Sequence, residues 1–106
     1  MKKINFSSES EIEGVFLIKA SSKSVFFNRK RKLEKLTGFS DCMFDSYGED
    51  DEGGVWKVIT TATFDNIDEL KSVIKKVEKF NWLFLNDSEL LIDGEYLYSD
   101  GKWSEC

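Results

Sequence analysis

A run of four carboxylates is the densest group of chemically competent side chains in this 106-residue sequence. It consists of Glu49, Asp50, Asp51 and Glu52, with Gly48 before it and Gly53-Gly54 after it. Like charges in a row repel one another and have no periodicity that could bury them, and flanking glycines favour a turn. The run therefore predicts a solvent-exposed loop of high negative charge. Such a loop can steer association with a basic partner, and its carboxylates can stand where phosphates stand in a nuclease cleft.

The residue types around this run do not favour catalysis or metal binding. Calcium loops alternate carboxylates with spacers and add a distant glutamate, a pattern that the run lacks. The chain contains no histidine, the usual acid–base group at neutral pH. Cys42 and Cys106 have neither metal-ligand spacing nor a histidine to activate them. We therefore expect no enzymatic activity, no metal and no cofactor.

The same run is expected to contact a protein partner. Asp45 and Tyr47 precede it closely and are expected to flank the contact. The predicted partner-binding set is therefore Asp45, Tyr47, Glu49, Asp50, Asp51 and Glu52. The alternative interpretation is a hairpin tip that is charged only for solubility.

Composition indicates one folded domain over residues 1–106. Hydrophobic residues make up 41% of the chain and aromatic residues 14%, which is too apolar for a disordered chain. The net charge of −5 is unevenly distributed: residues 1–36 carry +5 and residues 37–70 carry −8. This pattern predicts basic helices and acidic loops. No apolar stretch is long enough to span a membrane, and no apolar segment follows Met1-Lys2-Lys3, so we expect a cytoplasmic protein.

The first half of the chain predicts a strand followed by a helix. Residues 12–20 read as a strand whose apolar run, 15–18, suggests burial on both faces, and Ile4 and Phe6 suggest a short strand before it. Ser22 or Ser24 can cap a helix that ends at Gly38. This helix carries the cations Arg29, Lys30, Arg31 and Lys32. Consecutive residues spread around a helix, so a solvated exterior is favoured over a nucleic-acid groove.

The middle of the chain predicts a hairpin and a second helix. Residues 42–47 and 55–64 read as antiparallel strands, which places the carboxylate run at the tip between them. Asp65 or Asn66 can cap the helix that follows, and Asn66 with Glu69 resembles a capping box. Its apolar stripe is Ile67, Leu70, Ile74 and Val77.

The last quarter of the chain predicts a β-meander. Asp93-Gly94 and Asp100-Gly101 separate short apolar runs, and Asp-Gly is typical of type I′ hairpin turns. Tyr96 and Tyr98 are expected on one face of a hairpin, with Trp103 on the next strand. The whole order predicts an α+β fold: a ferredoxin-like β-α-β-β-α-β sandwich with an appended C-terminal β-meander.

In overall character, the chain resembles the small acidic immunity proteins encoded beside bacterial toxins, including those of contact-dependent growth inhibition systems. The resemblance lies in the compact size, the scarcity of proline and histidine, and the exposed acidic cluster Glu49-Asp50-Asp51-Glu52. It implies a protein that binds its cognate toxin, a basic domain with nuclease activity, and occludes the active-site cleft, with no direct contact to nucleic acid or membrane. The alternative is a regulatory binding module contacted through its helices, or a phage-type inhibitor of a host nucleic-acid-binding protein.

Overall fold

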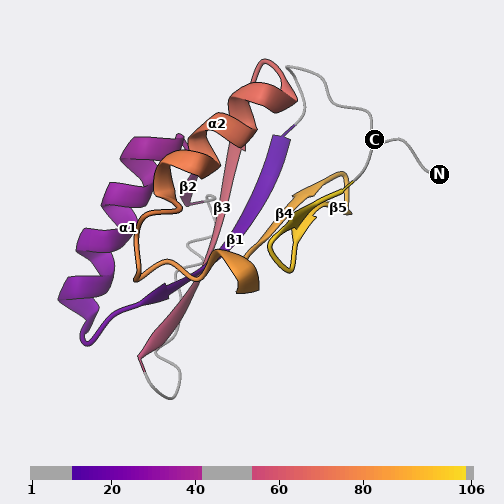
Figure 1. Ribbon diagram of the computed structural model, residues 1–106. Coiled ribbons are helices and arrows are strands. Elements are labelled where there is room, and N and C mark those ends of the chain that lie inside the picture. The colour runs from indigo at the N-terminus through magenta and orange to yellow at the C-terminus, as the bar shows by residue number, and fades with distance from the viewer. Residues whose placement is uncertain (1–10, 42–53, 105–106) are drawn as a thin grey trace.

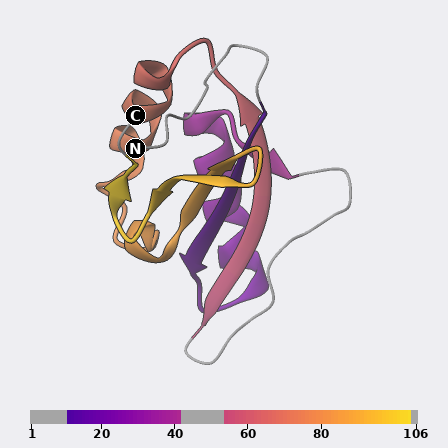
Figure 2. The same ribbon diagram turned by 90° about the vertical axis from the view of Figure 1, so that its right-hand side faces the viewer.

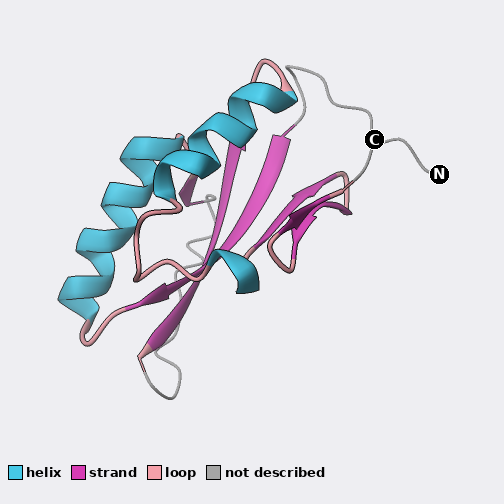
Figure 3. Ribbon diagram, in the orientation of Figure 1, coloured by secondary structure: helices cyan, strands magenta, loops and turns pink. Residues whose placement is uncertain are grey.

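The computed structural model describes residues 11–41 and 54–104, and these form an α+β fold with one antiparallel sheet and two helices (Figure 1). Both helices lie on the same side of the sheet (Figure 3). Among the described residues the sheet has six strands, in the order β2-β3-β1-β4-β5-β6. The α+β class predicted from the sequence is therefore confirmed.

The centre of the sheet is a pair of long strands, β1 (Glu11–Lys19) and β3 (Val55–Thr63). They run antiparallel along their full length, from the Glu11–Thr63 pair to the Lys19–Val55 pair. The other strands are shorter: β2 (Ser40–Asp41) pairs with β3, and β4 (Glu89–Ile92) pairs with the free edge of β1. β5 (Glu95–Ser99) and β6 (Lys102–Trp103) extend the sheet beyond β4 (Figure 2).

The edge of β1 that β4 leaves free is covered by an irregular segment. Lys19 donates its backbone N–H to the Trp82 carbonyl oxygen at 2.7 Å, and Phe84 donates to the Leu17 carbonyl oxygen at 2.9 Å. The 3₁₀ turn η1 (Leu85–Asp87) then leads into β4. Ser88 joins the two parts, because its Oγ accepts from the Leu17 N–H at 3.1 Å and donates to the Phe84 carbonyl oxygen at 2.7 Å.

Both helices begin at a predicted capping residue, and α1 also ends at the predicted glycine. α1 (Lys23–Thr37) is capped by Ser22, whose Oγ accepts from the Val25 N–H, and it ends at Gly38 with a left-handed φ of 85°. α2 (Ile67–Val77) is capped by Asn66, whose Oδ1 accepts from the Glu69 N–H at 2.9 Å. Of the two caps that the sequence left open at each helix, the chain uses Ser22 and Asn66.

The core lies between the helices and the inner face of the sheet. Its fully buried side chains come from every layer and include Phe16, Phe26, Phe39, Leu33, Leu70, Ile74, Val58, Leu90 and Ile92. On β1 the expected burial on both faces is only partial: Phe16 and Ile18 are fully buried, whereas Val15 and Leu17 on the opposite face are half-buried. The outer face of β1 and β3 therefore keeps some contact with solvent.

Gly14 makes room for one of the core rings. A Cβ atom at Gly14 would lie 2.6 Å from Phe16 Cε2 and 2.9 Å from Phe39 Cε1. Phe16 and Phe39 meet edge to face, with 5.3 Å between their centroids, and Phe39 also contacts Phe64 at 5.5 Å. The absent side chain at Gly14 lets this aromatic cluster pack directly on the strand.

The C-terminal meander has the two predicted turns and one unpredicted irregularity. Asp93, Gly94, Asp100 and Gly101 all have positive φ, as type I′ turns require. The expectation that Tyr96 and Tyr98 share a face is wrong. Leu91 pairs with Tyr96 and Leu90 with Tyr98, so Leu97 is an extra residue that forms a bulge in β5. The bulge places Tyr98 on the opposite face of the sheet from Tyr96. Tyr98 is consequently buried, and Tyr96 is 50% exposed.

Some sequence predictions fall outside the described residues. These are the short strand around Ile4 and Phe6, the strand over 42–47 and the tip of the hairpin. Neither described helix is long and apolar enough to cross a membrane.

Candidate functional site

The predicted partner-binding residues Asp45, Tyr47, Glu49, Asp50, Asp51 and Glu52 all lie outside the described residues. The strands on either side of them are described, and they pair with each other. Ser40 of β2 faces Thr61 of β3, and Asp41 faces Thr60, in antiparallel register. The acidic run therefore belongs to the connection between two neighbouring antiparallel strands, and β2 is the last of the described strands at that edge of the sheet.

The C-terminal end of this connection is fixed to the end of β1. The Ala20 N–H donates to the Gly54 carbonyl oxygen at 2.8 Å, and the indole N–H of Trp56 donates to the Ala20 carbonyl oxygen at 3.2 Å. Gly54 has a φ of 76°, and a Cβ there would lie 2.7 Å from the Ala20 carbonyl oxygen. Glycine is thus required both by the backbone conformation and by the close approach.

The net charge of the chain comes from outside the described residues. The described ranges contain 13 of the 15 Lys and Arg residues and 13 of the 20 Asp and Glu residues, so they are neutral overall. Residues 42–53 alone contain five carboxylates and no cation. Within the neutral part, α1 carries six cations against Glu34, which makes the helical layer basic.

The four consecutive cations of α1 make separate contacts within the fold. Arg29 donates to the Lys19 carbonyl oxygen and lies over the Trp82 ring, with 5.7 Å from Cζ to the centroid. Lys30 is buried and its Nζ lies 3.1 Å from the Glu34 carboxylate. Arg31 donates to the Asn28 side-chain oxygen at 2.6 Å. The expectation that these cations do not form one continuous binding groove agrees with this arrangement.

Lys32 shares a small aromatic platform with Arg29. The rings of Phe80 and Trp82 stack at 4.7 Å with an interplanar angle of 16°. Lys32 Nζ lies 4.9 Å from the centre of the Phe80 ring, and Lys79 Nζ lies 5.6 Å from it. The contacts of Arg29 with Trp82 and of Lys32 with Phe80 hold the loop after α2 against α1, whereas the Lys79 contact lies within that loop.

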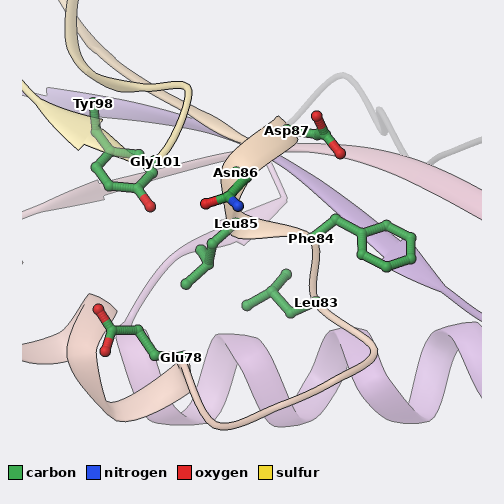
Figure 4. A pocket seen from close by; sticks show the side chains of 8 residues that line it. All are labelled: Glu78, Leu83, Phe84, Leu85, Asn86, Asp87, Tyr98 and Gly101. Atoms are coloured by element: carbon green, nitrogen blue, oxygen red, sulfur yellow. The ribbon is translucent and has the colours of Figure 1, made fainter.

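A hollow of about 430 Å³ lies between the end of α2, η1 and the β5–β6 turn (Figure 4). Its described lining consists of Glu78, Leu83, Phe84, Leu85, Asn86, Asp87, Tyr98 and Gly101. Figure 4 shows Glu78 and Tyr98 on opposite sides, with the side chains of Leu83 and Leu85 between them. This lining combines an apolar floor with the Glu78 carboxylate, the Asn86 amide and the Tyr98 phenol, whereas the Asp87 carboxylate is directed away from it.

Tyr98 is held in this lining by packing. It is only 6% exposed, and its ring meets the Trp103 ring edge to face at 4.9 Å. Burial raises the pKa of the Tyr98 hydroxyl above its ordinary value of 10.0, and the negative charge of Glu78 raises that pKa further. The phenol therefore stays protonated and remains a hydrogen-bond donor at neutral pH.

Sequence reasoning did not find this hollow. Its residues come from three separate segments, and the bulge at Leu97 that turns Tyr98 inward has no sequence signal of its own. The one local signal was Asp100-Gly101, which fixes the turn that brings Gly101 against Asn86.

Comparison of the chain with family models, with curated proteins and with solved structures found no match.

Proposed function

We propose that this protein is an immunity-type inhibitor: a non-enzymatic cytoplasmic protein that binds a cognate toxin of nuclease activity and occludes its basic active-site cleft. Glu49, Asp50, Asp51 and Glu52 pair with the toxin's lysines and arginines. Asp45 and Tyr47 flank that contact. The protein itself contacts neither nucleic acid nor membrane.

One observation carries the proposal. β2 and β3 pair antiparallel on both sides of the acidic segment, and Gly54 is tied to Ala20 where β3 begins. A segment with five carboxylates and no cation is thereby attached at both ends to the edge of an otherwise neutral domain. Charge concentrated in this way accelerates association with a basic surface and favours a basic partner over other proteins.

We further propose that the architecture is the ferredoxin-like sandwich, β-α-β-β-α-β, with β5 and β6 added as a meander. The order β2-β3-β1-β4 and the antiparallel pairing of all neighbours support this topology. In this order β2 and β6 stand at opposite ends of the described strands.

The test uses the toxic C-terminal domain of the large secreted protein that the proposal expects in the neighbouring reading frame. Co-expression with the intact chain should restore growth, and the association rate should fall steeply as salt rises. The variant Glu49→Ser, Asp50→Ser, Asp51→Ser, Glu52→Ser should lose at least about tenfold in association rate at low salt. Unchanged binding by this variant, or binding insensitive to salt, would overturn the proposal.

The matched control removes exposed cations from the helical layer. Arg31→Ser with Lys35→Ser leaves the acidic connection intact and changes the net charge by two units in the opposite direction. Its binding should be unchanged or slightly faster. Loss of binding in this control, with retention in the acidic-run variant, would instead support the regulatory module contacted through its helices.

A further inference from the structure

The hollow between Glu78 and Tyr98 is lined by a hydroxyl that has no hydrogen-bond partner among the described residues. Tyr98 as a residue is only 6% exposed, and its hydroxyl makes no hydrogen bond with any described residue. Figure 4 shows this hydroxyl directed to the space between the ring of Tyr98 and Asn86. A hydroxyl that faces a hollow without a partner among the described residues is available to bond a water or a ligand there.

The charges around the hollow have one sign. Its described lining includes the acidic residues Glu78 and Asp87 and no lysine or arginine, and Figure 4 shows the Glu78 side chain facing the hollow and the Asp87 side chain directed away from it. Neither carboxylate makes an ion pair with any described residue. Glu78 faces Tyr98 across the hollow (Figure 4), and its charge acts on the Tyr98 hydroxyl. The site therefore favours a cationic group, whose N–H can donate a hydrogen bond to the phenol oxygen.

The floor between these polar groups is apolar. Leu83 and Leu85 lie between Glu78 and Tyr98, and the Tyr98 ring forms one wall. A ligand that fits this lining has an aliphatic or planar stem with a cationic end. Arginine and lysine side chains have this form, because their stems pack on apolar surface while the charge stays at the tip.

We propose that this hollow binds a basic side chain, an arginine or a lysine, of the protein partner. The cationic end lies beside the Glu78 carboxylate, and its stem packs on Leu83, Leu85 and the Tyr98 ring. The choice of a protein side chain as occupant rests on the proposed function, in which the partner is a basic toxin. The hollow then provides a second contact, formed by residues that are not part of the β2–β3 connection.

The first experiment tests the pocket without any toxin. The full-length ¹⁵N-labelled chain is titrated with Nα-acetyl-arginine amide and, separately, with Nα-acetyl-citrulline amide, which has the same shape and no charge. The amide signals of Asn86, Asp87 and Gly101 should shift and saturate with the arginine compound. The citrulline compound should bind at least about fivefold more weakly. Equal binding of the two compounds, or shifts located elsewhere, would overturn the inference.

Variants of the lining residues test the roles of its polar groups. Glu78→Gln should remove most of the preference for arginine over citrulline, because only the charge is lost. Tyr98→Phe should weaken binding of the arginine compound about threefold to tenfold. Asp68 is an exposed carboxylate in the first turn of α2. Asp68→Asn should change neither the affinity for the arginine compound nor its preference over citrulline. The same spectra report whether each variant is folded. Retained preference in a folded Glu78→Gln variant would contradict the proposal.

The second experiment separates this inference from the proposed function. The acidic-run variant should still bind the arginine compound at the hollow, whatever its affinity for the toxin. In the complex, Glu78→Gln should raise the toxin dissociation rate about tenfold. If the arginine compound binds but Glu78→Gln leaves toxin dissociation unchanged, the assignment to a partner side chain is wrong while the proposed function stands. Tighter binding of free arginine than of Nα-acetyl-arginine amide would identify a free amino acid as the ligand. That result would also overturn the assignment of the hollow to a side chain of the partner.

Discussion

The indole N–H of Trp56 donates a hydrogen bond to the backbone carbonyl oxygen of Ala20 across 3.2 Å, between the start of β3 and the residue that follows β1. Ala20 also donates its own N–H to Gly54, so one residue ties down both the side chain and the backbone at the end of the acidic connection. The Trp56 ring in turn stacks on Phe26 of α1 at 4.7 Å. The point where the acidic connection rejoins the sheet is therefore coupled to the helical layer.

Replacing Trp56 by phenylalanine should destabilise the fold by about 1–2 kcal/mol, because it removes the indole donor and part of a buried ring. The stacking on Phe26 is largely kept. Urea unfolding followed by circular dichroism measures the loss. Phe27→Leu, which changes a half-buried ring beside Phe26, is the comparison. A stability equal to that of the unchanged chain would show that the Ala20 hydrogen bond contributes nothing.

Gly14 should not tolerate even the smallest side chain. The added methyl group of Gly14→Ala would collide with two buried rings, Phe16 and Phe39, neither of which can swing into solvent. Overpacking of this kind costs about 1–3 kcal/mol. Urea unfolding should show this loss, and the near-ultraviolet dichroism of the aromatic cluster should change. Gly14→Ala combined with Phe39→Leu relieves the contact with Phe39 and leaves more room for the Phe16 ring to move, so it should be less destabilised than the sum of the two single variants.

The sequence predicted what depends on neighbouring residues and missed what depends on packing across the fold. Asn66 could be recognised as a cap because its partner, the Glu69 N–H, lies three residues away. Both Asp-Gly turns could be recognised because positive φ is a local requirement.

Gly14 was not recognised, since its need for a missing side chain depends on how the rings of Phe16 and Phe39 pack over it, and Phe39 is 25 residues distant in the chain. The face of the sheet on which Tyr98 lies was mispredicted because it also depends on contacts between separate segments. The side chains of β5 do not alternate strictly, because Leu97 has no partner on β4. This depends on the register between two strands, which cannot be read from the sequence of one strand.

The stability of the protein should depend on the protonation of Tyr98 at alkaline pH. Because burial and then Glu78 raise the pKa of this hydroxyl in the folded state, the folded protein holds the proton more tightly than the unfolded chain. The resulting stabilisation is fully present below the ordinary pKa of 10.0 and is lost as the pH rises through the higher folded value.

The comparison with Tyr98→Phe isolates this effect, since the other tyrosines and the lysines titrate in both proteins. The difference in unfolding free energy between the two proteins should be constant below pH 10.0 and should decline above it. Glu78→Gln should reduce that decline without abolishing it, because burial, the larger cause, remains. A difference that stays flat at all pH values would contradict the raised pKa.

Gly94 and Gly101 provide a matched pair for testing whether the β5–β6 turn shapes the hollow. Both occupy the second position of an Asp-Gly turn, with φ of 79° and 75°, so alanine is strained at either position by about 1 kcal/mol. A Cβ at Gly94 would meet nothing within 4 Å, whereas one at Gly101 would lie 2.5 Å from the Asn86 side-chain oxygen.

Gly101→Ala should therefore be more destabilising than Gly94→Ala in urea unfolding. It should also shift the amide signals of Asn86 and Asp87, which Gly94→Ala should leave in place. Asn86→Ala removes the colliding oxygen, so Gly101→Ala made in that background should cost about the same as Gly94→Ala. Equal losses for the two glycines in the unaltered chain would mean that Asn86 can turn aside freely. The turn would then have no part in holding the Asn86 side of the hollow.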